Sequence, residues 1–380
     1  MSDTPSDKDK PNADAKAQQS VDAKGVDAKD VETKDADAKV ADASKAAAPQ
    51  ADPTKTHVAQ TIKHPTPLIA CRFEPGGKYV FAAAQDYRVW RYELGTKEDP
   101  QPTEFAGHES WVRAIAFTAD GKTMITGGYD GRLVWSPVDA KKPEPVRTVE
   151  AHDGWIRAIA VSPDGKLLAS VGNDLLVKLW NAADGAAVGQ LAGHESHIYN
   201  VAFHPEGGHL VSGDLKGNFL HWDLKAMKEQ RRFAEETLHK YDGTFWADIG
   251  GPRGMAFSPD GGLLAASGIT EVTNAFAGVG VPTVVVFDWR KGERKVQYLG
   301  KDKPRGTGWG VVMHPAGFTI GVSGGSGGFL LFWKGDEKDE FHQVKLPDTG
   351  RDLDLHPDGL RLATVHSNGQ LVISKMADKA

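Results

Sequence analysis

A short pattern recurs seven times in this chain of 380 residues. Each copy has an apolar anchor residue, and a Gly follows the anchor four positions later, usually with a Pro between them. The anchors are separated by 44, 44, 42, 54, 56 and 42 residues, and they are Phe73, Phe117, Val161, Phe203, Phe257, Met313 and Leu355. A period of about forty residues indicates a repeat architecture, in which each copy is one small unit that buries its apolar face against its neighbours.

The third copy shows what one unit contains. Its short apolar runs end at Val161, Ser170 and Trp180, and the turns SPDGK and GND separate them. Pro presets one turn dihedral and Gly tolerates positive φ, so these turns connect neighbouring antiparallel strands. Each unit then has four strands and no room for helices. The sequence therefore predicts an all-β fold, a seven-bladed β-propeller of four-stranded antiparallel blades.

The two ends of the repeat region predict how the ring closes. The last repeat stops after its third strand, LVISKM up to Met376, whereas THVAQTI at residues 56–62 is a strand without a blade. Pairing of this N-terminal strand with the C-terminal blade completes the seventh sheet and removes both free edges. We therefore expect one propeller domain over residues 56–376.

Four repeats carry a His nine residues before the anchor, and a Trp stands near the end of the third strand in six repeats, including Trp90 in the first. Here the chain resembles the WD-repeat family, whose blades carry Gly-His near the start and Trp-Asp at the end; Gly107-His108, Gly193-His194 and Trp222-Asp223 match.

The resemblance implies a hydrogen-bonded set of His, Ser or Thr, Asp and Trp inside a blade. The matching residues are His108, Thr126, Asp130 and Trp135 in the second blade, His152, Ser170, Asp174 and Trp180 in the third, and His194, Ser212 and Trp222 in the fourth. In the fourth blade Lys216 stands at the Asp position, which predicts a weaker network. The first blade also carries the His, His64, whereas blades five to seven lack it.

Ser, His and Asp are also the residues of a hydrolase triad, and His is a common metal ligand. Repetition of the same set in neighbouring blades favours structural networks instead. The His-Pro turns are dispersed over separate blades, at His204, His314 and His356. We expect no metal, no cofactor and no enzymatic activity. The alternative is a lactonase-like hydrolase with an active site in the channel, which is disfavoured because the innermost strands hold only two acidic residues, Asp352 and Asp354.

Residues 1–55 have a different composition from the repeats. They lack Leu, Ile, Phe, Tyr and Trp, repeat variants of Asp-Ala-Lys, and contain 9 Lys against 12 Asp and Glu. Such a segment cannot bury enough apolar surface to offset its ordering entropy. We predict a disordered Asp/Ala/Lys-rich tail, which solubilises the protein or, alternatively, serves as a binding arm.

Composition narrows the class of protein further. The net charge of −6 argues against general affinity for nucleic acid, although an Arg-lined surface leaves that alternative open. The only Cys, Cys71, excludes an internal disulfide and is typical of a reducing compartment. The repeats contain no apolar run of about eighteen residues. We expect a cytoplasmic protein that is not bound to membranes and is a monomer in isolation.

The position four residues before each anchor lies roughly 13 Å along the innermost strand, near the opposite opening of the channel. Four of the seven residues there are Arg, and the set is Ile69, Arg113, Arg157, Tyr199, Arg253, Trp309 and Arg351. Two residues further back stand Trp111, Trp155 and His197, together with Pro67, Gly251, Thr307 and Thr349. The WD-repeat resemblance implies that this location borders a mouth where peptides bind.

Guanidinium groups offer forked donors to carboxylate or phosphate, and indoles offer flat apolar faces. We therefore predict that the Arg/Trp-rich face binds a protein or peptide through an acidic or phosphorylated segment. The alternative is that the Arg pair with loop carboxylates such as Asp153 or Glu109, and that Trp111 and Trp155 pack between blades. Two long connections, at residues 238–251 and 268–284, bring further apolar residues to the same side, where they contact a partner or only cover one another: Phe245, Trp246, Phe276 and Val279.

Overall fold

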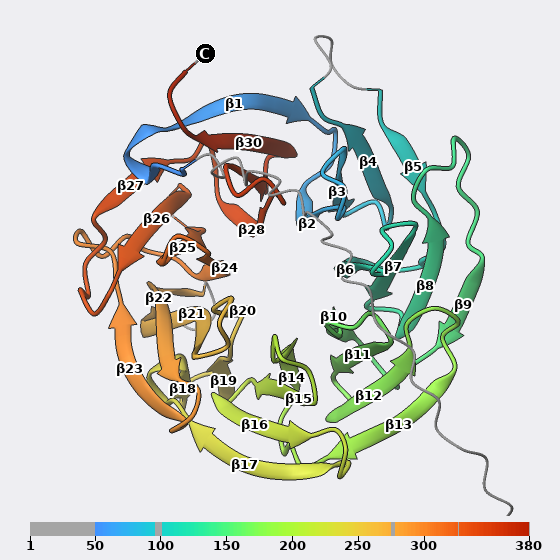
Figure 1. Ribbon diagram of the computed structural model, residues 1–380. Helices are drawn as coiled ribbons and strands as arrows, with labels where there is room; N and C mark the ends of the chain where they lie inside the picture. The colour runs from blue at the N-terminus through green and yellow to red at the C-terminus, as the bar shows by residue number, and fades with distance from the viewer. Residues whose placement is uncertain (1–49, 96–100, 275–277, 326, 380) are drawn as a thin grey trace, which may run out of the picture. The chain divides into compact units, whose positions relative to one another are not determined.

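The computed structural model describes residues 50–95, 101–274, 278–325 and 327–379. These residues lie in one compact unit, residues 47–380. They form seven four-stranded antiparallel sheets arranged around a central axis (Figure 1), which confirms the predicted seven-bladed propeller. No helix among the described residues is long and apolar enough to cross a membrane.

In the first six blades the strands run from the innermost to the outermost in sequence order, and in the seventh β1 takes the outermost place. The first blade contains β2 (Leu68–Phe73), β3 (Tyr79–Ala84), β4 (Val89–Glu93) and β5 (Thr103–Phe105). The second contains β6 (Val112–Phe117), β7 (Thr123–Gly128), β8 (Arg132–Pro137) and β9 (Arg147–Glu150). The third contains β10 (Ile156–Val161), β11 (Leu167–Gly172), β12 (Leu176–Asn181) and β13 (Ala187–Ala192). The fourth contains β14 (Ile198–Phe203), β15 (His209–Asp214), β16 (Asn218–Asp223) and β17 (Lys228–Ala234).

The fifth blade contains β20 (Gly254–Phe257), β21 (Leu263–Asn274), β22 (Val279–Asp288) and β23 (Glu293–Tyr298). It is preceded by a 3-10 turn, η2 (Glu236–Leu238), and by a separate hairpin of β18 (His239–Asp242) and β19 (Ala247–Gly250). The sixth contains β24 (Gly308–His314), β25 (Phe318–Ser323), β26 (Phe329–Lys334) and β27 (His342–Lys345). The seventh contains β28 (Gly350–Leu355), β29 (Arg361–His366), β30 (Gln370–Met376) and β1 (Thr56–Lys63).

The repeated anchors end the innermost strands, and the Gly that follows each of them makes the turn to the second strand. All seven Gly adopt positive φ, between 67° at Gly121 and 82° at Gly317. L-residues with a Cβ rarely adopt this conformation, which explains why Gly recurs at this point in every repeat.

The ring closes within the seventh blade. Strand β1 pairs antiparallel with β30, in a register that runs from Thr56 opposite Met376 to Lys63 opposite Gln370. The short turn η1 (Pro53–Lys55) continues this contact, because Asp52 N donates to Met376 O at 2.9 Å and Lys55 forms an ion pair with Asp378 at 2.8 Å. Residues 50–55 are therefore part of the propeller and not of the tail, which corrects the boundary that we predicted between residues 55 and 56. The rest of the predicted tail, residues 1–49, lies outside the described residues.

The predicted polar network is complete in the third blade. Trp180 Nε1 donates to Ser170 Oγ at 2.8 Å, and Ser170 Oγ lies 2.7 Å from His152 Nε2. His152 Nδ1 lies 2.8 Å from a carboxylate oxygen of Asp174. Because a carboxylate only accepts, a neutral His152 carries its proton on Nδ1, and its Nε2 accepts from the Ser170 hydroxyl. The chain of donors thus runs from the Trp through the Ser and the His to the Asp.

The fourth blade corrects one expectation. Lys216 leaves no gap in the network, because Asp214 Oδ2 lies 3.0 Å from His194 Nδ1. Ser212 Oγ completes the set, at 2.7 Å from His194 Nε2 and 2.8 Å from Trp222 Nε1. The network of this blade is therefore as complete as that of the third.

The second blade departs from the expected network at its Trp. His108 bonds Thr126 Oγ1 at 2.8 Å and Asp130 Oδ2 at 3.0 Å, but Trp135 Nε1 donates to Ala182 O in the third blade. Trp135 stands one residue earlier in its strand than Trp180 does, and a shift of one residue turns a strand side chain to the other face of its sheet.

The first blade has a variant set, in which Tyr takes the place expected for Trp. Tyr92 OH lies 3.0 Å from His64 Nδ1, whereas Trp90 Nε1 donates to Asp86 at 3.1 Å.

Candidate functional site

All seven residues that stand four positions before an anchor line one cavity at the mouth of the channel. The cavity has a volume of about 270 Å³, and its walls also include Trp111, Tyr129 and Trp155. No acidic residue lies among these described lining residues. We call this cavity the mouth. Of the residues two positions further back, only Trp111 and Trp155 line it; His197 is exposed outside it, and Pro67, Gly251, Thr307 and Thr349 are not part of its walls.

A β-bulge aims these side chains at the mouth. The register of the innermost strand shifts at the residue four before the anchor in six blades, for example between Val112 and Ala114 at Arg113. A bulge inserts an unpaired residue and re-aims its side chain. In the fifth blade Arg253 stands just before β20, and its N donates to Ser267 O at 2.7 Å.

Cationic and aromatic side chains alternate around one half of the mouth. The guanidinium carbon of Arg157 lies 4.6 Å from the ring centroids of both Trp155 and Tyr199. Arg253 lies 4.3 Å from Tyr199 and 5.5 Å from Trp309. Arg351 follows at 5.4 Å from Trp309. We call these six residues the cation–π belt; such contacts hold a guanidinium group in place without neutralising its charge.

Two aromatic rings add a flat platform beside the belt. Tyr129 stacks on Trp155, with ring centroids 4.3 Å apart and planes within 2° of each other. Trp111 and Trp155 remain 39% and 44% exposed, so part of each ring is accessible to a ligand. Both Trp therefore line the mouth, and Trp155 also packs against Tyr129 of the neighbouring blade.

The Arg of the mouth are not paired with loop carboxylates. Glu109 forms its ion pair with Arg132 at 2.8 Å, and among the described residues no ion pair joins Asp153 to an Arg. Arg157 Nε donates to the neutral amide oxygen of Asn173 at 2.9 Å.

Of the Arg that line the mouth, only Arg113 has an acidic neighbour at 4 Å or closer in the described part of the chain, and the contact is long, 3.9 Å to Asp352. The Nε atoms of Arg253 and Arg351 are buried without a hydrogen-bond partner in the described structure. Burial is the main cause that lowers the pKa of both side chains, and the nearby Arg113 adds to the shift in each.

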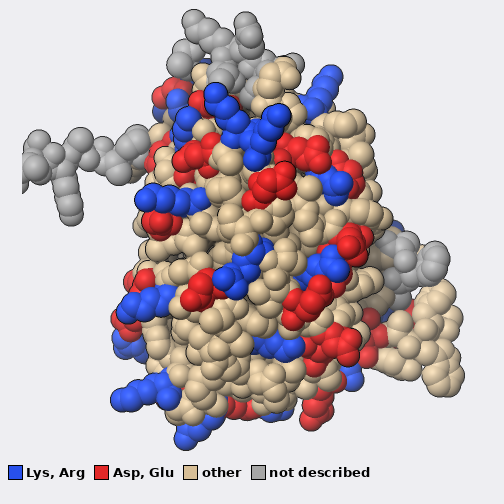
Figure 2. Space-filling view, turned by 90° about the vertical axis from the view of Figure 1, so that its right-hand side faces the viewer, with Lys and Arg blue, Asp and Glu red and all other residues tan. Residues whose placement is uncertain are grey.

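The charge at the mouth contrasts with that on the side of the propeller. Figure 2 shows basic and acidic side chains interspersed on the side that faces the viewer. Pairs such as Arg88 with Glu104 at 2.9 Å and Arg132 with Glu150 at 2.7 Å neutralise one another on the outer strands.

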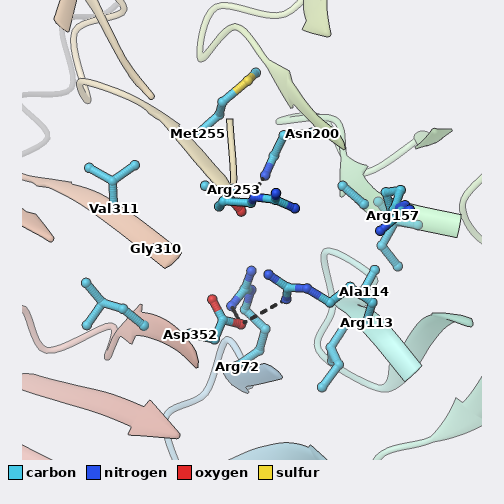
Figure 3. A pocket seen from close by; sticks show the side chains of 15 residues that line it. Arg72, Arg113, Ala114, Arg157, Asn200, Arg253, Met255, Gly310, Val311 and Asp352 are labelled. Carbon is cyan, nitrogen blue, oxygen red and sulfur yellow. Dashed lines mark hydrogen bonds and ion pairs between the residues drawn. The ribbon is translucent and has the colours of Figure 1, made fainter. Parts of the chain in front are cut away.

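A second, inner cavity of about 70 Å³ lies further along the channel (Figure 3). It exists because the residue three before the anchor faces the channel and is small in most blades, as with Ala114, Ala158, Gly254 and Gly310. Its polar lining residues are Arg72, Arg113, Arg157, Asn200, Arg253 and Asp352. Arg72 and Asn200 were missed by the sequence analysis, which considered only positions four and six before each anchor.

The two acidic residues of the innermost strands tie the seventh blade to the first. Asp352 Oδ2 accepts from Arg72 Nη1 at 2.8 Å and from Cys71 N at 3.1 Å. Asp354 Oδ2 accepts from Phe73 N at 2.7 Å. Burial raises the pKa of Asp354 to about 6, although Arg72 opposes the shift. Among the described residues no group of three or more His, Cys, Asp or Glu is arranged to hold a metal ion.

The hairpin β18–β19 carries an exposed aromatic tip. Trp246 is 83% exposed and Phe245 is 52% exposed. Ile249 packs against Ile269 and Val272 of β21, which anchors the hairpin to the fifth blade. Trp246 is therefore not covered by the neighbouring described loop residues. Val279 is half-buried, and Phe276 lies outside the described residues.

The comparisons with known proteins agree with this fold. The family model for the WD domain, G-beta repeat, matches residues 100–135, 143–181 and 185–223, which cover most of the second, third and fourth blades. Three matched repeats within a seven-bladed propeller make this chain a WD-repeat protein.

Two curated relatives match shorter stretches. The chain is 34% identical over 95 residues to a protein named Transcription initiation factor TFIID subunit 5 from Caenorhabditis elegans, which covers 25% of this chain and 13% of the relative. It is 33% identical over 63 residues to Lissencephaly-1 homolog 1 from Paramecium tetraurelia, which covers 17% of this chain and 16% of the relative. The matches thus span only a small part of each relative's length.

Proposed function

We propose that this chain is a non-enzymatic scaffold for protein–protein interaction, whose mouth binds an acidic or phosphorylated segment of a partner protein. The observation that carries the proposal is the cation–π belt, which presents Arg157, Arg253 and Arg351 beside exposed Trp faces. Arg and Trp at the centre of a concave surface are the typical composition of binding hot spots.

The chemistry of the mouth selects for anions. Guanidinium groups bind carboxylate and phosphate through two parallel hydrogen bonds, and these charge-assisted bonds are stronger than neutral ones. The aromatic rings of the belt do not neutralise the guanidinium charges, so these groups remain able to attract an anion. The Trp111 and Trp155 faces accept the side chains that flank the charged residue of the partner.

The comparisons support a scaffold. One relative is named as a subunit of a transcription initiation factor, so that protein works within an assembly. The disfavoured alternative, a hydrolase with a channel active site, needs free carboxylates or His that converge on the channel. Asp352 and Asp354 are instead bonded to Arg72 and to the backbone of β2. We also propose a cytoplasmic location, because the only Cys, Cys71, is a buried free thiol.

A panel of fluorescent peptides tests the proposal. Each member has a central Ser, Glu or phosphoserine in otherwise matched flanks, and binding is measured by fluorescence anisotropy at fixed ionic strength. We expect the Glu and phosphoserine members to bind and the Ser members to bind at least tenfold more weakly, because one charge-assisted hydrogen bond contributes about 1.5–3 kcal/mol.

Variants of the mouth locate the binding. Arg351→Ala and Trp155→Ala are each expected to weaken binding about tenfold or more without a change in melting temperature. Arg88→Ala is the matched control, because Arg88 pairs with Glu104 on the outer strands of the first blade. Equal binding of charged and neutral peptides, or unchanged binding by both mouth variants, would contradict the proposal. A single-stranded RNA probe that binds more tightly than the peptides and loses affinity steeply with salt would favour nucleic acid instead.

A further inference from the structure

The inner cavity concentrates more positive charge than its single carboxylate neutralises. Arg72, Arg113, Arg157 and Arg253 line it, and Asp352 is the only acidic group among the lining residues. Asp352 Oδ2 is already engaged by Arg72 Nη1 at 2.8 Å and lies 3.9 Å from Arg113 Nη1. In Figure 3 the guanidinium groups of Arg72, Arg113 and Arg253 point toward the middle of the cavity. Asp352 is therefore shared by Arg72 and Arg113, and among the described residues no carboxylate pairs with Arg157 or Arg253.

One buried donor among the described residues of the inner cavity has no acceptor. Arg253 Nε is buried and has no hydrogen-bond partner among the described residues. Asn200 Oδ1 accepts from the backbone N of Val201, and Asn200 Nδ2 donates to Arg253 O at 3.1 Å, which holds the amide beside the Arg. Buried donors without acceptors are costly, and like charges at close range add to that cost. An anion at the centre of these groups would relieve both costs.

The size of the space limits what this anion can be. A buried water needs about 15 Å³ of cavity volume, so the volume of about 70 Å³ accommodates roughly four or five waters. The four oxygens of one tetrahedral oxyanion fit such a space, and a peptide backbone does not. The Arg donors come from blades one, two, three and five, so they surround the middle of the cavity. A planar carboxylate is instead bound best by two parallel donors from one guanidinium group.

We propose that the inner cavity is a binding site for one compact, multiply charged oxyanion of the phosphate class, held by the guanidinium groups of Arg72, Arg113, Arg157 and Arg253. Phosphate carries about two negative charges near neutral pH and several strong acceptor oxygens, which match the unpaired donors. The site does not depend on the proposed peptide binding at the mouth, because Arg72 and Asn200 line the inner cavity only. Arg351, Tyr199 and Trp309 line the mouth only.

Titration of the full chain with inorganic phosphate tests the proposal. Isothermal titration calorimetry is run at constant ionic strength with chloride as the balancing anion, and the melting temperature is followed in parallel. Phosphate is expected to bind with a stoichiometry of one and to raise the melting temperature, because a ligand that binds only the folded state stabilises it. Chloride at the same ionic strength is expected to leave the melting temperature unchanged.

Two Arg variants form a matched pair. Arg253→Met removes a guanidinium that lines both cavities, whereas Arg351→Met removes the equivalent residue of another blade, which lines the mouth alone. Arg253→Met is expected to weaken phosphate binding about tenfold or more, and Arg351→Met to leave it unchanged. A third variant, Asn200→Asp, places a carboxylate in the inner cavity and is expected to abolish the phosphate effect while the protein remains folded.

Two results would overturn the oxyanion site. One is the absence of phosphate binding in the wild-type chain, and the other is an equal loss of binding in both Met variants, which would place the anion at the mouth. If phosphate fails while the phosphoserine peptides still bind and respond to Trp155→Ala, only the inner site is rejected. If phosphate binds and the peptides do not, only the proposed peptide binding is rejected.

Competition between phosphate and a phosphoserine peptide identifies the source of the oxyanion. If phosphate and the peptide exclude each other, and this exclusion is lost in Arg253→Met, the phosphoryl group of the docked peptide fills the site. Simultaneous binding supports a site filled by the free anion.

Discussion

The blades differ in how many hydrogen bonds depend on one buried hydroxyl group, and this difference predicts a graded effect on stability. Ser170 is fully buried, and its Oγ bonds both His152 at 2.7 Å and Trp180 at 2.8 Å. Thr126 bonds the His of its network, His108, at 2.8 Å but not the Trp, because Trp135 donates elsewhere; its other contact, with Val134 O, is long at 3.4 Å. Ser170→Ala therefore leaves two buried nitrogen atoms without a partner, whereas Thr126→Val removes the hydroxyl and leaves one.

Each buried polar group that loses its partner costs about 1–3 kcal/mol. Ser170→Ala is thus expected to lower the free energy of unfolding by about 4 kcal/mol, and Thr126→Val by about 2 kcal/mol. The assay is urea denaturation followed by Trp fluorescence, and midpoints are compared only between variants that keep the wild-type m value.

Ser212→Ala provides the internal control. Ser212 also bonds both a His and a Trp, so its loss should match that of Ser170 within about 1 kcal/mol. A loss for Thr126→Val as large as that for the two Ser variants would refute the reasoning, because it would show that the number of orphaned partners does not set the cost.

Three further predictions concern charge burial and ring closure. Burial and the neighbouring Arg231 lower the pKa of His221 to about 4, below the value of about 6.5 in the unfolded chain. The free energy of unfolding therefore falls by up to about 3 kcal/mol as pH drops from 6.5 to 4. His221→Leu should remove this loss, measured by denaturation at pH 7.5 and 4.5. The pKa of Asp354 is raised from its ordinary value of 3.8 to about 6, so stability is lost as pH rises from about 4 to about 6, and the full cost of the buried charge is present above that range. Asp354→Asn, which keeps an acceptor for Phe73 N, should therefore stabilise by up to about 3 kcal/mol at pH 7.5 and have little effect below pH 4; the same gain at both pH values would contradict this. Removal of residues 1–63, which takes away β1, should lower the melting temperature well below that after removal of residues 1–49 alone, and equal melting temperatures would show that the closing strand contributes no stability.

The repeat pattern alone predicts the fold, because the anchors and the Gly after them fix where every innermost strand ends. It also predicts which side chains meet at the mouth, since one position in seven equivalent strands must gather around one axis. Counting residues does not reveal the β-bulge at that position, which depends on how the strand pairs with its neighbour. Strict alternation from the anchor would place Arg113 on the opposite face from Ala114, and only the bulge turns it to the mouth.

The number of residues between two partners does not predict their contact when one partner occupies a different position in its blade. In the second and third blades the His and Asp of the network are 22 residues apart, but His194 and Asp214 are 20 apart. A spacing of 22 residues from His194 leads to Lys216, which is not the residue that completes the network. Arg72 was missed for a related reason, because the partner that holds it, Asp352, lies 280 residues away and becomes its neighbour only when the ring closes.

The pairing of β1 with β30 also has a consequence during protein synthesis. Thr56 and Met376 face each other in one sheet although 320 positions separate them. At about 5–20 residues per second, the ribosome needs roughly 15–60 s to advance from one to the other. During that time β1 has no partner strand, and its unpaired backbone N–H and C=O groups can pair with another nascent chain. We therefore expect misassembly of this protein to be most frequent on polysomes, where nascent chains are close together.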